Sequence, residues 1–167
     1  MAVGVYAFAD PDEVQGMLSF QMIFTWDPSR MHLNGVSTVG GQPFTAIGFI
    51  HDAYGINETN PPTDGNAMLI GLGPLGSSIV VPQQGVLLTT MLFDALAPAS
   101  GTPLTILPSA GSPVGTTVVY GDTGPNVSVT GTTTGTSITI IPAPCSAVLL
   151  AAGASILGRR RRDAATR

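Results

Sequence analysis

Residues 15–26 read Gln-Gly-Met-Leu-Ser-Phe-Gln-Met-Ile-Phe-Thr-Trp, and Asp27-Pro28 follows them directly. Large apolar side chains recur at every second position of this stretch, namely at Leu18, Phe20, Met22, Phe24 and Trp26. The positions between them carry Met17, Ser19, Gln21, Ile23 and Thr25. A period of two over this length predicts a half-buried β-strand whose first set of side chains faces the core. Asp27-Pro28 ends the strand, because proline cannot donate to a β-ladder and aspartate favours a turn.

Similar short segments recur on the C-terminal side of this strand, separated by turn-forming residues. We expect extended structure at residues 31–39, 44–50, 67–72, 78–81, 86–93, 103–107, 116–120, 126–130 and 137–141. Residues 52–66 are rich in turn formers and predict a long loop, and residues 94–100 have room for at most one helical turn. Many short strands at this spacing predict an all-β fold, an antiparallel β-sandwich of jelly-roll type, over residues 1–141.

Charge is distributed very unevenly along the 167 residues. Lysine is absent, and five of the six arginines lie in residues 159–167. Residues 1–158 therefore carry one base, Arg30, against nine acids, which is a net charge of −8. A body this acidic repels nucleic acid, so we expect no nucleic-acid partner.

The C-terminal residues 142–167 have the composition of a membrane-handling segment. Pro142-Ala143-Pro144 precedes an uncharged, mostly apolar run, Cys145 to Gly158, and Arg159-Arg160-Arg161-Arg162 follow it. As a helix the 14 residues of the run would span about 21 Å, which is short for a bilayer core of about 30 Å. Flanking arginines keep to the cytoplasmic side, so the body is expected on the other side. Two alternatives are a buried C-terminal helix, which the absence of a polar stripe disfavours, and nucleic-acid binding by the arginines.

This order of breaker, apolar run and basic cluster resembles the PEP-CTERM sorting signal of bacteria, with Ala143 where glutamate is usual. The resemblance implies export, a short hydrophobic membrane helix, and processing near Pro142, Ala143 and Pro144 by an exosortase-type enzyme. It further implies tethering at the cell envelope, flanked by Arg159, Arg160, Arg161 and Arg162. The final location would be the cell surface or the extracellular matrix, beside polysaccharide in a biofilm. Because Met1–Tyr6 lacks the basic start of a secretory signal peptide, we expect the natural start of the protein to lie upstream.

The body has a resemblance of its own. Phe20 to Leu33, with its Trp26-Asp27-Pro28 junction, and Gly85 to Phe93 resemble conserved strands of cohesin-type and related carbohydrate-binding sandwiches. The resemblance implies a carbohydrate- or protein-binding module across residues 3–141. In that family another strand precedes the segment that matches Val3–Phe8, so we expect one sheet edge to lack its partner, and an unpaired edge invites association.

Residues that could perform chemistry are sparse, and we expect no enzyme and no cofactor. His32 and His51 have no zinc-ligand spacing, and the lone Cys145 has no neighbouring base to activate it. The oxygen-rich loop at residues 57–60 and 64–66 leaves calcium binding as an alternative. Four aromatic residues are candidates for stacking on sugars, although the third is also expected in the core: Tyr6, Tyr54, Trp26 and Tyr120. The leading hypothesis is an exported, surface-associated structural or matrix protein, and the alternative is a cohesin-like binding module.

Overall fold

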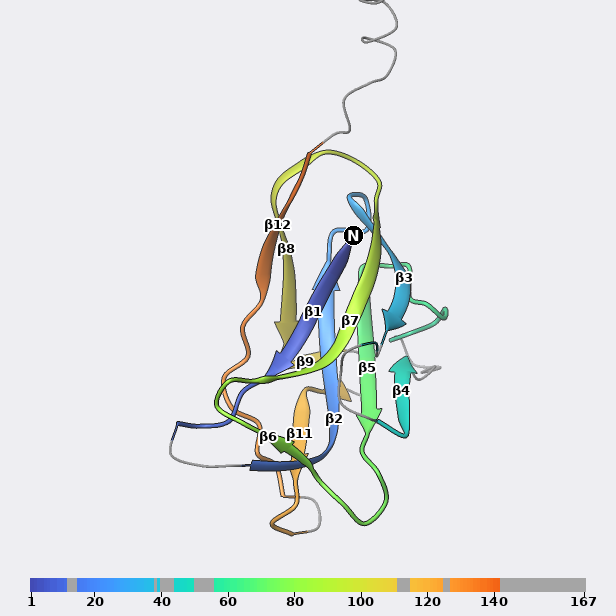
Figure 1. Cartoon of the computed structure of the whole chain (residues 1–167). Coiled ribbons are helices and arrows are strands. Elements are labelled where there is room, and N and C mark those ends of the chain that lie inside the picture. The colour runs from blue at the N-terminus through green and yellow to red at the C-terminus, as the bar shows by residue number, and fades with distance from the viewer. Residues whose placement is uncertain are drawn as a thin grey trace, which may run out of the picture.

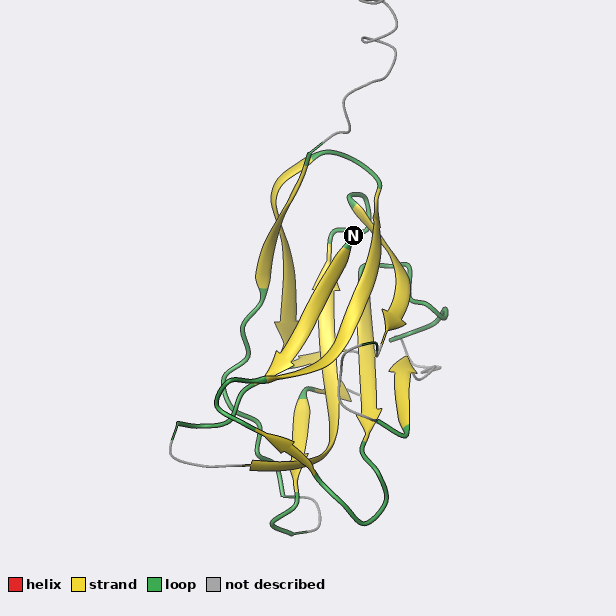
Figure 2. Ribbon diagram, in the orientation of Figure 1, coloured by secondary structure: helices red, strands yellow, loops and turns green. Residues whose placement is uncertain are grey.

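The computed structural model describes residues 1–11, 15–37, 39, 44–49, 56–110, 115–124 and 127–141. Twelve β-strands and no helix occur in this part of the chain (Figures 1 and 2). The strands are β1 (Ala2–Ala7), β2 (Gln15–Trp26), β3 (Met31–Ser37), β4 (Ala46–Phe49), β5 (Asn66–Leu72), β6 (Ile79–Val81), β7 (Val86–Ala95), β8 (Ala99–Leu107), β9 (Ser109–Ala110), β10 (Gly115–Thr116), β11 (Val118–Gly121) and β12 (Thr136–Ile140). The C-terminal helix and basic cluster expected in residues 142–167 lie outside the described residues.

The strands form two main sheets, and their pairings are antiparallel. The smaller sheet has the order β1-β7-β3, and the larger has the order β12-β8-β2-β5-β4. Strands β6 and β11 also pair with β2, and β9 pairs with β10 as a separate hairpin. Figure 1 shows the smaller sheet lying across the larger one. The expected all-β sandwich is confirmed.

Strand β2 runs through the centre of the larger sheet and supplies much of the core. Phe20, Met22, Phe24 and Trp26 are all buried, as their alternation predicts. The Trp26 ring packs edge-on against Phe93 of the opposite sheet, with 5.6 Å between ring centroids. Its Nε1–H donates to the Met31 carbonyl at 3.1 Å, so the one polar atom of the indole is satisfied in the core.

The predicted alternation is wrong at the start of β2. Met17 is 1% exposed and belongs to the core, whereas Leu18, predicted to face it, is 36% exposed. The inward-facing side changes between Met17 and Phe20, where β2 exchanges partners. Residues 15–17 pair with β6, and the ladder with β11 contains a register shift opposite Met17. A bulge of this kind rotates the side chains that follow it.

The other side of β2 is also partly covered, which alternation alone did not predict. Ile23, on the side predicted to be more polar, is fully buried. It packs with Ile56 and Met68 in a second apolar cluster, separate from the main core. The described part of the loop before β5, from Ile56 onward, therefore shields part of the outer face of the larger sheet.

One predicted strand is corrected. Of the strand predicted at residues 126–130, the described residues 127–130 form no strand and contain one bridge, between Ser128 and Tyr120. Residues 94–100 contain no helical turn, within the predicted limit of one, because β7 continues to Ala95 and β8 starts at Ala99. Arg30 ties down the short link between these strands: its carbonyl accepts from Leu96 N–H at 2.8 Å, and its guanidinium donates to the Pro98 carbonyl at 2.9 Å.

Candidate functional site

The sandwich is open along one side, where an outer strand of each sheet has a free edge. Among the described residues β1 pairs with β7 alone, and β12 pairs with β8 alone. Residues of β1 and Thr136, the first residue of β12, line the same cavity, so these two outer strands lie near each other on one side of the molecule. Unpaired backbone groups at such edges can bind an additional strand.

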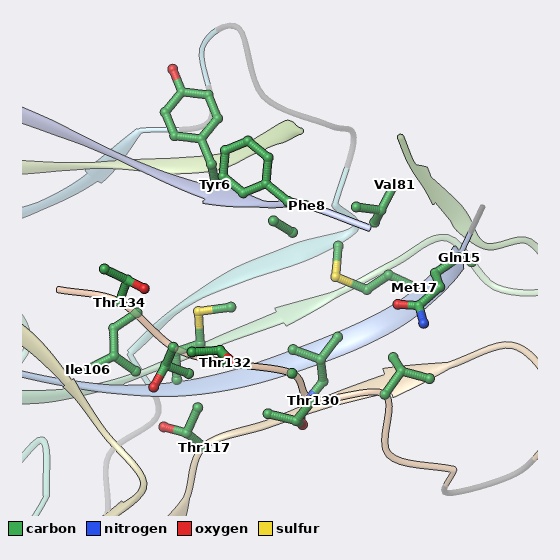
Figure 3. Close-up of a pocket in the computed structure, with 17 residues that line it drawn as sticks. Tyr6, Phe8, Gln15, Met17, Val81, Ile106, Thr117, Thr130, Thr132 and Thr134 are labelled. Carbon is green, nitrogen blue, oxygen red and sulfur yellow. The ribbon is translucent and has the colours of Figure 1, made fainter. Parts of the chain in front are cut away.

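Two adjoining cavities lie between these edges, and we call them together the edge groove. Their volumes are about 290 Å³ and about 200 Å³. Both are lined by Tyr6, Phe8, Ile106 and Thr134, which shows that they are neighbours. Figure 3 shows the larger of the two cavities, with Tyr6 and Phe8 on one side and the threonines on the other.

The first wall of the edge groove is aromatic. Tyr6 and Phe8 are 55% and 64% exposed, and their ring centroids are 6.2 Å apart. Phe8 lies against Gly85, where a Cβ would come within 2.4 Å of the ring. Gly85 also has a positive φ of 84°, so glycine at this turn gives the Phe8 ring its room.

The opposite wall is the threonine-rich segment at residues 130–136. Residues 131–135 precede β12 and belong to no strand. The wall is held at its start, because the Thr130 hydroxyl accepts from Val119 N–H at 2.7 Å. It is held at its end by close packing, since a Cβ on Gly135 would come within 2.6 Å of the Leu104 carbonyl oxygen.

The floor of the edge groove consists of core side chains of the larger sheet. Met17, Met22 and Ile106 reach it from β2 and β8. The Thr117 hydroxyl also lies there, but it donates to the Leu107 carbonyl at 2.6 Å and accepts from Ile23 N–H at 3.0 Å. No carboxylate, imidazole or thiol is among the described residues that line the two cavities. The groove therefore suits binding through apolar contacts and backbone hydrogen bonds, and it offers no acid–base pair.

The structure separates the aromatic residues that the sequence singled out. Tyr6 lines the edge groove, Tyr120 is half-buried in β11, and Trp26 is in the core. Tyr54 lies outside the described residues. Phe8 and the threonine wall were missed by sequence reasoning: the exposed aromatic alternation of Tyr6 and Phe8 was a usable signal, whereas a run of threonines looks like any polar loop.

The other candidate residues do not come together at the groove. His32 is half-buried in β3, opposite Asp94 of β7. His51, Cys145, the Pro142-Ala143-Pro144 motif and the arginines Arg159, Arg160, Arg161 and Arg162 lie outside the described residues.

The oxygen-rich loop uses its polar groups largely in internal hydrogen bonds. Asn57 is fully buried, and its amide both donates to the Met68 carbonyl at 2.7 Å and accepts from Met68 N–H at 2.9 Å. Asp64 accepts from the Asn66 side chain at 2.8 Å. Across the residues that the structure describes, no three His, Cys, Asp or Glu side chains are grouped closely enough to hold a metal ion.

The turn after β2 contains a carboxylate in a well-defined setting. The Ser29 hydroxyl donates to Asp27 Oδ1 at 2.6 Å, and Ser29 N–H donates to the same oxygen at 2.9 Å. These bonds, with a smaller contribution from Arg30, hold the pKa of Asp27 below its usual value. Asp27 is not among the residues that line the edge groove, so its role is to shape the turn.

Comparison with known proteins identifies the fold. No protein-family profile and no curated protein match the chain. Two solved structures with cohesin domains resemble it. One is the crystal structure, at pH 5.5, of CaCohA2 in complex with a variant of CaDoc0917, at 16% identity, 84% coverage of this chain, 89% of that chain and a TM-score of 0.57. The other is the seventh ScaB type I cohesin from Pseudobacteroides cellulosolvens, which is 11% identical. The match covers 87% of this chain and 85% of that chain, with a TM-score of 0.49.

The first of these similarities shows that the body is a cohesin-like β-sandwich. At 16% identity it concerns the fold alone. Within the described residues, no helix has the length and apolar character needed to cross a bilayer.

Proposed function

We propose that this chain is a non-enzymatic binding module: a cohesin-like sandwich that binds another polypeptide and is displayed at the cell envelope by its C-terminal segment. The observation that carries the binding role is the cohesin-like fold. The CaCohA2 structure that shares this fold was solved as a complex with CaDoc0917. The edge groove supports the same role, because its walls offer exposed aromatic rings and unpaired strand edges in place of catalytic groups.

The display role rests on the composition of residues 142–167. An apolar run bounded by two prolines and four arginines has the features of a sorting signal that a membrane-bound, exosortase-type enzyme recognises. We propose that the arginines hold the tail on the cytoplasmic face while the acidic body reaches the cell surface or the matrix outside. There the module would contribute to envelope or biofilm structure.

The test of display is cell fractionation of the protein in a host that has such a sorting system. Replacing all four arginines, Arg159 to Arg162, with glutamine removes the basic cluster while the apolar run is kept. We expect the variant to lose membrane retention and processing, measured by immunoblotting of fractions and by mass spectrometry of the mature C-terminus. Arg167→Gln is the matched control and should be processed normally. Unchanged fractionation and an intact C-terminus in both variants would refute the sorting proposal.

Extracellular polysaccharide is a second candidate ligand, favoured by the exposed Tyr6 and Phe8 rings beside a row of threonine hydroxyls. Aromatic faces stack on sugar rings and hydroxyls hydrogen-bond to them. Binding to a glycan array that is lost in Tyr6→Ala would support this ligand. If the array shows no binding and a protein partner is captured, polysaccharide is ruled out as the ligand and the polypeptide-binding role is supported.

A further inference from the structure

We propose that Asn34-Gly35, in the outer strand of the smaller sheet, is a site of spontaneous covalent modification. The Asn34 side chain loses its amide group and the residue becomes isoaspartate, which separates the end of β3 from β7. The reaction needs water and no enzyme, and it goes beyond the binding and display roles. The inference follows from the residue pair, from the bulge that contains it, and from the surroundings of the other described asparagines.

Asn34 differs from the other asparagines in the residue that follows it. The chain has five asparagines, and Asn34 is the one that precedes a glycine. Deamidation begins when the backbone nitrogen of the next residue attacks the side-chain amide carbon, and a Cβ on that next residue hinders the attack. Gly35 has no Cβ, and a Cβ built there would meet no described atom within 4 Å. The space around the attacking nitrogen is therefore open.

The backbone at this pair is irregular and lies at the edge of a sheet. In the ladder with β7, Leu33 pairs with Phe93 and Gly35 pairs with Leu92. Asn34 has no partner in this ladder and is the extra residue of a bulge. Gly35 has a φ of 143°, which glycine adopts readily. Strand β3 is the outer strand of the order β1-β7-β3, and Asn34 is exposed there (Figure 1). Its side chain can therefore turn toward the Gly35 nitrogen.

The other described asparagines lack one or more of these features. Asn57 is fully buried, and its amide is hydrogen-bonded to the backbone of β5. Asn60 precedes a proline, whose nitrogen carries no hydrogen to lose in the attack. Asn66 lies in β5, and its amide nitrogen donates to Asp64 Oδ2 at 2.8 Å. We therefore expect Asn34 to be modified before them.

The reaction proceeds in two steps. The Gly35 nitrogen loses its proton and bonds to Asn34 Cγ, the Cγ–Nδ2 bond breaks, and the amide leaves as ammonia with that proton. The product is a five-membered succinimide ring. Water then adds to one of the two ring carbonyls, and the C–N bond at that carbonyl breaks. Attack at Cγ gives aspartate, whereas attack at the main-chain carbonyl carbon gives isoaspartate, in which the chain passes through Cγ. One water is taken up and one ammonia is released, with no oxidation or reduction.

Isoaspartate at position 34 changes β3 in two ways. It adds a negative charge, and it lengthens the backbone by one carbon in a strand that already contains a bulge. The following residues, Gly35 to Ser37, pair with β7, and the Ser37 carbonyl accepts from the Thr89 hydroxyl at 3.1 Å. A longer backbone shifts the register of these pairings, so we expect this end of β3 to separate from β7.

Storage of the folded full-length chain at mildly alkaline pH, followed by peptide mapping with mass spectrometry, tests the proposal. The mass reports conversion of an amide to a carboxylate, and a methyltransferase specific for isoaspartate identifies the product. We expect conversion at Asn34 before Asn57 and Asn66. Asn34→Gln should abolish methylation, because glutamine would have to close a less favourable six-membered ring. Asn60→Gln, at another exposed site, is the matched control and should leave conversion at Asn34 unchanged.

Hydrogen–deuterium exchange then compares the stored chain with the fresh chain. We expect the amides of Gly35 to Ser37 to exchange at least about tenfold faster after storage. Asn34→Asp carries the charge without the additional backbone carbon, so it should exchange like the fresh chain. An Asn34 amide that survives while Asn66 converts would overturn the proposal, and so would isoaspartate at position 34 with unchanged exchange. Neither measurement involves a ligand or a membrane, so this proposal fails separately from those on binding and display.

Discussion

At the scale of single residues, Asn57 joins a loop to the sandwich. It is fully buried, has a left-handed φ of 57°, and exchanges two hydrogen bonds with the backbone of Met68 in β5. Its side chain thereby acts as a short additional strand beside β5. Asparagine suits the position because it tolerates the left-handed conformation and carries both a donor and an acceptor.

We expect Asn57→Ala to lower the free energy of unfolding by about 3 kcal/mol, because Met68 N–H and C=O would lose buried partners. Urea denaturation followed by tryptophan fluorescence measures the change. Asn34→Ala, at an exposed position of β3, should change stability by less than about 0.5 kcal/mol. Equal effects of the two substitutions would show that the Met68 contacts contribute nothing.

The Asp27 turn predicts a specific dependence of stability on pH. The folded pKa of Asp27 is lowered, chiefly by the Ser29 hydroxyl and then by Ser29 N–H. A lowered pKa stabilises the fold above the unfolded pKa of about 3.9, and this contribution is lost as the pH falls through the folded value. Asp27→Asn should therefore be less stable than the unmodified chain near pH 6, and the difference should shrink below about pH 4. Thermal unfolding of both proteins from about pH 6 to about pH 2.5 measures this stability difference, and Glu58→Gln is an exposed control. A difference that stays constant across this pH range would contradict a lowered pKa of Asp27.

At the scale of elements, β2 organises the larger sheet because it pairs with β5, β6, β8 and β11 along its length. Its change of inward-facing side near Met17 follows from this exchange of partners. A strand that pairs with one neighbour along its whole length keeps a strict alternation of buried and exposed side chains. Strand β2 passes from one neighbouring strand to the next and has a bulge near Met17, where it changes partner.

Substitutions at Met17 and Leu18 therefore test which of these two side chains of β2 faces the core. We expect Met17→Ala to destabilise the protein by about 2–4 kcal/mol, because it leaves a cavity in the core. Leu18→Ala, at a half-exposed site, should cost less than about 1 kcal/mol. Unfolding midpoints in urea distinguish the two, and the reverse order would restore the strict alternation that the sequence suggests.

At the scale of the whole molecule, the chain combines an acidic sandwich with a tail in which an uncharged apolar run is followed by four arginines. The sandwich buries its core well, but among the described strands it leaves one edge each of β1 and β12 unpaired on one side. An open side of this kind promotes association unless something covers it. The proposed capture of a polypeptide partner would satisfy these backbone edges.

The amino-acid sequence by itself determined the fold class, most strand positions and the composition of the tail, because alternation, turn residues and charge are local properties. It also identified Tyr6 as an exposed aromatic residue. Only the tertiary structure decided that Met17 and Ile23 are buried, that the described residues 127–130 form no strand, and that Tyr6 and Phe8 face the segment at residues 130–136. Each of these depends on pairing between segments that lie far apart in the chain, and no local pattern specifies which edges remain free.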